Sequence, residues 1–201
     1  MKPALIIFAR RPVEGKVKTR LAKTIGSSEA LSVYRQLLNY THSVLLTIDA
    51  DRFVYYSDEI DDKDHWLNKH YYKRLQAEGD LGDKMKRAFD ELFQMGYQKV
   101  IILGTDCPEL ESQHIQNAII ELDEKDVVIG PAKDGGYYLL GKKRMITDLF
   151  SNKLWSTENV LHQTLSDLER LNISYSLLST LTDIDEEADW LPFKQKLELF
   201  K

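Results

Sequence analysis

Short apolar runs alternate along the chain with longer stretches in which apolar residues recur every three or four positions. Seven of the short runs are rich in β-branched and aromatic residues, a composition typical of strands. They span residues 4–9, 52–57, 71–76, 100–104, 126–130, 137–141 and 173–179. Several are apolar at consecutive positions, which indicates strands that are buried on both faces of a sheet.

The longer stretches have the periodicity of helices with one apolar face. They predict five helices, which begin at about residues 28, 81, 112, 156 or 157, and 186. Gly96 is placed to end the second helix, and Ser112 is placed to cap the third. Pro192 is expected to break or kink the last helix, because proline lacks the amide hydrogen that a helix interior needs.

Strands that alternate with helices predict an α/β fold, a three-layer α/β/α sandwich around a mostly parallel mixed sheet. Only a short loop separates the runs at 126–130 and 137–141, which allows one antiparallel strand. The 201 residues contain no repeat, low-complexity tract or Gly/Ser-rich linker. We therefore expect a single domain over residues 1–201.

Charged residues are distributed unevenly along this sequence. The formal net charge is −5, yet the first 23 residues hold seven basic side chains and Glu14 as their one acid. The basic residues are Lys2, Arg10, Arg11, Lys16, Lys18, Arg20 and Lys23. A local basic segment on an acidic protein suits a small anion better than a polyanion, so nucleic acid is not an expected partner.

Cys107 is the single cysteine, which excludes an internal disulfide and a metal site of several cysteines. No local histidine signature accompanies it, so we interpret it as a packing residue. No apolar stretch approaches the roughly 20 residues of a membrane span, and the run at 4–9 is too short for the core of a signal peptide. These features predict a cytoplasmic protein in a reducing compartment.

A basic loop, "ARRPVEGKVKTRL", follows the first predicted strand. Ligands of α/β sheets bind beyond the carboxyl ends of the strands, so this loop is well placed to bind one. Lys16, Lys18 and Arg20 could gather around phosphate oxygens, or the loop could be a solvated basic surface. The sequence is neither a P-loop nor a G-x-G-x-x-G fingerprint, because the required glycines are missing.

Acidic residues follow two other strands. Asp106 comes just after the run at 100–104, and Asp183 and Asp185 come after the last strand. Mg²⁺ prefers oxygen ligands and is often held by one or two carboxylates and by substrate phosphates. Asp106 could instead form a turn before Pro108, and Asp185 could cap the final helix. The basic loop together with both acidic ends favours the metal site.

Two glycine-containing loops are further candidates. Gly135 and Gly136 lie between Asp134 and the two tyrosines Tyr137 and Tyr138, where glycine permits either close approach of a ligand or a hairpin turn.

The second such loop, "QAEGDLGDKM", precedes a predicted helix. Amide groups at Gly79 and Gly82 could bind an anion or the edge of a base. Alternatively, Asp80 serves only as the N-cap of that helix.

Six motifs now give the chain a recognisable resemblance. They are "FARRPVEGKVKTRL", "QAEGDLGDKM", "GTDCPEL", "GPAKDGGYYLLG", "WSTENVL" and "DIDEEADW". In this order they resemble a bacterial family with the GT-A fold, within the nucleotide-diphospho-sugar transferase superfamily. That family has long been described as a domain of unknown function and is often labelled as glycosyltransferases. The resemblance covers residues 5–190.

The resemblance implies roles for particular residues. Nucleotide binding is implied for Arg10, Lys16, Lys18, Arg20, Gln76, Gly79 and Gly82. Metal binding is implied for Asp106, Asp183 and Asp185. The acceptor would bind at Gly135, Gly136, Tyr137 and Tyr138. Asp106, Lys18, Arg20 and Asp134 would be the catalytic residues.

The implied activity is that of a Mg²⁺- or Mn²⁺-dependent transferase. Our first expectation is transfer of a glycosyl group from a nucleotide-sugar to a small acceptor. The alternatives are a nucleotidyltransferase, which joins an NTP to a phosphorylated metabolite and releases pyrophosphate, and a non-catalytic nucleotide-binding module. A first loop with one glycine departs from sugar-nucleotide synthetases, and Glu186 and Glu187 replace the Thr-Pro of many relatives. The base, sugar, acceptor and oligomeric state remain open.

Overall fold

The computed structural model describes residues 2–61, 64, 66 and 68–201, and a seven-stranded sheet forms its centre. The strands are β1 (Ala4–Ala9), β2 (Asp51–Tyr56), β3 (Tyr72–Leu75), β4 (Val100–Leu103), β5 (Val127–Pro131), β6 (Tyr137–Lys142) and β7 (Tyr175–Leu177). Their order across the sheet is β3-β2-β1-β4-β6-β5-β7. Each strand overlaps one of the predicted runs, so the expected α/β class is confirmed.

The sheet is parallel except at β6. β1 pairs in parallel with both β2 and β4, and β5 pairs in parallel with β7. β6 runs antiparallel to β4 and to β5, as the short loop before it allows. All the other strands therefore deliver their carboxyl ends to one edge of the sheet.

The helices occupy the stretches between the strands. They are α1 (Ala22–Ile25), α2 (Ser27–Leu46), α3 (Leu81–Gln94), α4 (Ser112–Glu124), α5 (Val160–Arg170), α6 (Glu187–Trp190) and α7 (Lys194–Glu198), with 3₁₀ turns at Thr147–Phe150 (η1) and Leu191–Phe193 (η2). Pro192 lies in the turn that separates the two last helices, and Gly96 has a φ of 93° just after α3, as predicted. No helix in the described ranges is long and apolar enough to cross a membrane.

The predicted cap of the third helix and the predicted start of the fourth were wrong. Glu111, and not Ser112, is the N-cap of α4, and its amide donates a hydrogen bond to His114 Nδ1 at 3.0 Å. α5 begins at Val160 instead of at Ser156 or Thr157. Ser156 has a φ of 62°, a left-handed conformation that a right-handed helix cannot contain.

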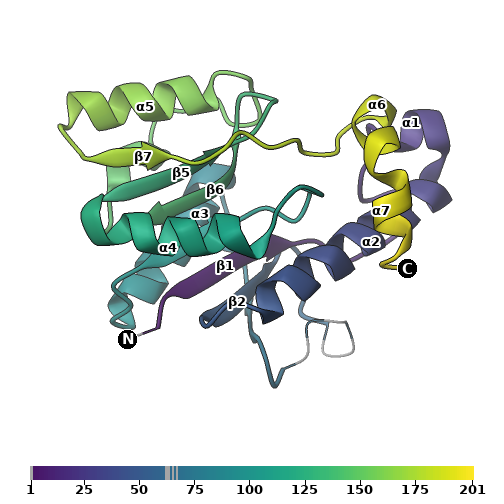
Figure 1. Ribbon diagram of the computed structural model, residues 1–201, viewed down its shortest axis with the longest axis horizontal. Coiled ribbons are helices and arrows are strands. Elements are labelled where there is room, and N and C mark those ends of the chain that lie inside the picture. Colours follow the sequence, from purple (N-terminus) through teal and green to yellow (C-terminus); the bar gives the residue numbers. More distant parts are fainter. Residues whose placement is uncertain (1, 62–63, 65, 67) are drawn as a thin grey trace.

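Helices cover both faces of the sheet, which gives the three layers (Figure 1). Side chains alternate along β1, so that Leu5 and Ile7 pack in one buried cluster and Ile6 packs in another. α2 and α4 supply the helical side of the first cluster, and α3 and α5 supply that of the second. Burial on both faces explains why the predicted strands are apolar at consecutive positions.

The C-terminal segment forms a third cluster at one end of the molecule. In Figure 1, α6 and α7, drawn in yellow, lie beside α1 and α2. Ile184, Trp190 and Leu197 are buried there against residues of α2. The ammonium of Lys196 donates to the carbonyl of Pro108 at 2.8 Å. This contact connects the C-terminal segment to the turn that follows β4.

Candidate functional site

A cleft opens at the sheet edge where the parallel strands end. Its first cavity, of about 490 Å³, is lined by a residue just past each of four adjacent strands: Arg10, Ser57, Gln76 and Asp106. Open α/β sheets bind ligands at this edge. The topology therefore gathers side chains from four distant parts of the sequence.

A second cavity, of about 550 Å³, continues the cleft beyond β4. Asp134, which follows β5, and Asp183, which follows β7, line it together with residues of the segment 155–160. The two cavities share Arg10, Arg20, Leu81, Asp106, Ser156 and Asp185. They are therefore two halves of one cleft that meet at Asp106 and the two arginines.

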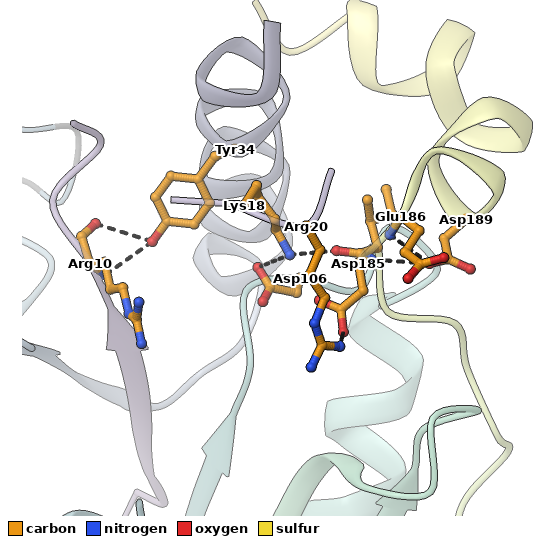
Figure 2. A network of polar contacts seen from close by, with 9 residues as sticks. Arg10, Lys18, Arg20, Tyr34, Asp106, Asp185, Glu186 and Asp189 are labelled. Carbon is orange, nitrogen blue, oxygen red and sulfur yellow. Dashed lines mark hydrogen bonds and ion pairs between the residues drawn. The ribbon is translucent and has the colours of Figure 1, made fainter. Parts of the chain in front are cut away.

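Lys18 is fixed at this junction by two contacts (Figure 2). Its ammonium lies 2.9 Å from Asp106 Oδ1 and donates to the carbonyl of Ile184 at 2.5 Å. Asp106 Oδ1 is buried and forms no regular hydrogen bond within the described residues, so its contact with Lys18 is an ion pair by distance. Lys18 has a φ of 47°, a conformation that costs a non-glycine residue about 1–3 kcal/mol. The fold thus holds this lysine in an unfavourable conformation beside a carboxylate.

Arg20 forms the second ion pair across the junction, at 3.0 Å from Asp185 Oδ2. Asp189 holds the backbone at Asp185 in place, because its Oδ2 accepts hydrogen bonds from the amides of Asp185 and Glu186 at 3.1 and 2.9 Å (Figure 2). Both Arg20 and Asp185 are substantially exposed, so a ligand can compete for either side chain.

Tyr34 fixes the start of the basic loop. Its hydroxyl accepts a hydrogen bond from the Arg10 amide at 3.0 Å and donates one to the Arg10 carbonyl at 3.1 Å (Figure 2). Burial and the nearby charge of Asp106 raise the pKa of Tyr34 above its ordinary value, so the hydroxyl keeps its proton. This side chain from α2 lines the first cavity, and sequence reasoning missed it because it occupies a position on the apolar face of its helix.

Asp183 is a largely buried carboxyl group with other carboxylates nearby. Burial, followed by the charges of Asp106 and Asp134, raises its pKa to about 7, and Lys18 acts in the opposite direction. A cation bound nearby would relieve this repulsion. Within the described ranges, however, no three His, Cys, Asp or Glu residues are gathered closely enough to form a metal site by themselves.

Comparison with known proteins identifies the family of this chain. Residues 40–157, more than half of the chain, match a family described as "Uncharacterized protein conserved in bacteria (DUF2064)". The chain belongs to the DUF2064 family.

Curated relatives of this DUF2064 chain carry one name. A protein of Methanocaldococcus vulcanius named 2-phospho-L-lactate guanylyltransferase is 25% identical over 183 residues, which cover 90% of this chain and 78% of the relative. A protein of the same name from Methanocaldococcus jannaschii is 25% identical over 182 residues, covering 90% of this chain and 76% of the relative.

Solved structures place the chain in its superfamily. A Desulfovibrio desulfuricans G20 protein assigned to the nucleotide-diphospho-sugar transferases aligns with a TM-score of 0.87 and 26% identity, over 100% of this chain and 99% of that one. The 4-diphosphocytidyl-2C-methyl-D-erythritol synthase of Anaerococcus prevotii aligns with a TM-score of 0.63 and 12% identity, over 98% and 96% of the two chains. The expected fold and superfamily are confirmed, and the expectation of a transferase enzyme is supported.

Most of the residues singled out in the DUF2064 sequence line the cleft. The first cavity includes Arg10, Lys18, Arg20, Gln76, Gly79, Asp106 and Asp185. The second includes Asp134, Gly136, Tyr137 and Asp183, together with the shared residues.

Two residues expected at the nucleotide lie elsewhere. Lys16 is exposed and lines neither half of the cleft. Gly82 packs against Trp155, because an added Cβ would lie 2.4 Å from the indole nitrogen. Asp80 is the N-cap of α3 and accepts a hydrogen bond from the Asp83 amide at 2.9 Å, as the alternative interpretation of this loop predicted.

Two residues expected at the acceptor also have structural roles. Gly135 has a φ of 87°, and an added Cβ would lie 2.0 Å from the Glu158 carbonyl oxygen, so this position requires glycine for the turn and for packing. Tyr138 is buried and donates a hydrogen bond to the Ser179 carbonyl at 3.2 Å. Cys107 is buried too, and burial raises the pKa of its thiol to about 12, which agrees with a packing role.

Several lining residues had no assigned role in the sequence. Leu81 and Lys84, in the first turn of α3, line the first cavity. The sequence feature that could have indicated Lys84 is its position one turn into a helix that follows a glycine-containing loop. The motif "WSTENVL" supplies residues 155–158 and 160 to the second cavity. This motif was one of the six that carry the family resemblance, but no role was predicted for any of its residues.

Proposed function

We propose that this DUF2064 chain is a nucleotidyltransferase, the alternative that the sequence left open. The observation that carries this proposal is the division of one cleft into two cavities that meet at Asp106 and Arg20, where Lys18 forms an ion pair with Asp106. A cleft of this form can bring a nucleoside triphosphate and a phosphorylated acceptor together at cationic groups. The guanylyltransferase name of the curated relatives supports nucleotidyl transfer over the glycosyl transfer that we first expected.

The first cavity would hold the nucleotide. Its volume of about 490 Å³ is within the range of small-molecule sites. Gln76 and Gly79 lie on the side of β3, where a base or ribose would bind. Arg10, Lys18 and Arg20 would face the phosphates and neutralise their charge, which is the main requirement of phosphoryl chemistry.

The reaction would take place at the junction of the cavities. An oxygen of the acceptor phosphate attacks the α-phosphorus and forms a new P–O bond. The bond from the α-phosphorus to the bridging oxygen breaks, and the pyrophosphate leaves with the electron pair. The protein holds the two substrates in line and stabilises the charge of the leaving group through Lys18 and Arg20.

The residues at the junction fit a divalent cation. Within the described residues Asp106 has a buried oxygen without a regular hydrogen bond, and burial together with the charges of Asp106 and Asp134 raises the pKa of Asp183. Two carboxylates plus phosphate oxygens and water suit Mg²⁺ or Mn²⁺, so a ready group of three ligands is not needed. Asp106 with Asp183 or Asp185 would hold the ion, which when bound neutralises phosphate charge. A structural neighbour from Mycobacterium tuberculosis, 11% identical, was solved with manganese.

The test of this proposal is a product assay with each of the four ribonucleoside triphosphates, nucleotide-sugars and phosphorylated acceptors. Pyrophosphate release that depends on both an NTP and an acceptor supports the proposal. Release of free nucleoside diphosphate from a nucleotide-sugar would establish glycosyl transfer instead. Nucleotide binding with neither product would establish a binding module.

The role of Asp106 can be tested separately with Asp106→Asn, which keeps the shape of the side chain and removes its charge. We expect a loss of about 100-fold or more in turnover and the loss of Mn²⁺-dependent nucleotide binding by calorimetry. Asp123→Asn is the matched control, since Asp123 pairs with Lys99 on the surface and lines neither cavity. Equal metal-dependent binding by the Asp106 variant and by wild type would return Asp106 to a turn role.

A further inference from the structure

The second cavity is strongly acidic beyond its junction with the first. Its acidic lining residues are Asp106, Asp134, Glu158, Asp183 and Asp185. Among the described residues, its basic lining residues are Arg10 and Arg20, and both also line the first cavity. A divalent cation at Asp106 and Asp183 or Asp185 would offset part of this charge. Asp134 and Glu158 would still have no cationic partner among the described residues that line the cavity.

The remaining wall supplies apolar surface and hydrogen-bonding groups. Tyr137, Trp155 and Val160 line the same cavity, and the Tyr137 hydroxyl is buried with no hydrogen-bond partner in the described structure. The Asp134 carboxylate is held in place, because its Oδ1 accepts a hydrogen bond from the Gly136 amide at 2.9 Å. The wall therefore offers fixed acceptors and aromatic faces to a ligand.

From this wall we infer the class of the acceptor, on the basis of the proposed nucleotidyl transfer. The acceptor carries one anionic group, its phosphate, and its other end presents hydroxyl or ammonium donors and no carboxylate. Carboxylates accept hydrogen bonds from both kinds of donor, and aromatic rings attract an ammonium. A second anion near Asp134 and Glu158 would meet like charge, which disfavours its binding. The acceptor would thus differ from the phospholactate named for the curated relatives, which bears a carboxylate.

The experiment uses three phosphate monoesters of two-carbon alcohols that differ at the far end. Phosphoethanolamine ends in an ammonium, ethylene glycol phosphate in a hydroxyl, and phosphoglycolate in a carboxylate. Pyrophosphate release is measured for each with the NTP that the protein uses. We expect phosphoglycolate to react at least about tenfold more slowly than the better of the other two. The order of those two identifies the donor that the cavity prefers.

The variant Asp134→Asn connects this selectivity to the cavity wall. Asparagine keeps the oxygen that accepts from the Gly136 amide and removes the charge, so the disadvantage of phosphoglycolate should shrink by about threefold or more. Asp123→Asn removes a charge from the surface and should leave the ratio unchanged. If phosphoglycolate is the best acceptor, or if Asp134→Asn leaves the ratio as it is, the inference is overturned while nucleotidyl transfer stands. If none of the three esters reacts while another phosphorylated acceptor does, the inference is overturned and nucleotidyl transfer stands; if no phosphorylated acceptor releases pyrophosphate with any NTP, the proposed function fails.

Discussion

Two lysines with almost fully buried side chains occupy opposite edges of the sheet. Lys18 lies in the cleft, where its ammonium contacts the Asp106 carboxylate and the Ile184 carbonyl. Lys142 ends β6 and pairs in register with Val100 and Val127, the first residues of β4 and β5. Because β6 is antiparallel, this places Lys142 away from the cleft.

Their surroundings differ in chemistry as well as in place. The Lys142 nitrogen lies 4.0 and 4.1 Å from the ring centroids of Phe89 and Phe150, and 4.0 Å from the sulfur of Met145. Burial lowers the pKa of Lys142 well below its ordinary value. Lys18 has a carboxylate as counter-charge and lines the first cavity. Burial of a lysine amine therefore does not indicate a functional role by itself. The groups that contact the amine distinguish a lysine of the cleft from one of the core.

The largest expected effect comes from Lys18→Met. The variant removes the cation at the junction of the cavities, so we expect a loss of about 100- to 1,000-fold in turnover, as when a transition-state contact is removed. Lys16→Met is the matched control in the same loop, because Lys16 is exposed outside the cleft. Pyrophosphate release measures both variants. A comparable loss of turnover in Lys18→Met and Lys16→Met would mean that the loop acts through its overall positive charge. The specific partners of Lys18 would then not explain how it differs from Lys142.

Lys142→Met should have a smaller effect, and on stability instead of turnover. The variant removes an amine that the core leaves without a strong hydrogen-bond partner, and we expect the free energy of unfolding to rise by about 1–3 kcal/mol. Urea unfolding at pH 7 measures this change. Lys143→Met, at the next position and less buried, should stay within about 0.5 kcal/mol of wild type. A clear loss of stability in Lys142→Met would show that the two rings stabilise the ammonium.

The same two lysines show how far the sequence could lead. Lys18 was identified because local features suffice: a basic loop directly follows a strand, and ligands bind where strands end. Lys142 follows an apolar run and is indistinguishable in sequence from a solvated residue at a strand end. Its burial depends on the pairing of β6 with β4 and β5 and on the packing of α3 and η1, which are long-range contacts.

The glycines near the cleft show a similar limit to what the sequence can predict. Short apolar runs predicted all seven strands of the sheet and the edge at which most of the candidate site residues gather. This pattern could not separate a glycine that lines the cleft, such as Gly136, from one that leaves room for a neighbouring side chain or carbonyl, such as Gly82 or Gly135. That distinction depends on Trp155 and Glu158, which approach from another part of the chain. Tyr34 was missed for the same reason, since its partner is the backbone of a distant loop.

The smallest expected effect is the pH dependence of the contribution of Lys142 to stability. It shows whether the core disfavours the ammonium of Lys142 or the two aromatic rings stabilise it. In the unfolded chain this lysine has a pKa near 10.5, and in the folded protein its pKa is lower. Between the two values the unfolded chain binds more protons, so the stability of wild type rises with pH by at most about 1.4 kcal/mol per unit. Lys142→Met lacks this contribution, and its advantage over wild type should narrow as the pH approaches 10.5. Urea unfolding at pH 7, 8.5 and 10 measures the difference, with Lys143→Met as the control for the other titrating groups. A difference that stays constant from pH 7 to pH 10 would mean that the rings keep the pKa of Lys142 at or above its unfolded value, so that the core favours its charged form.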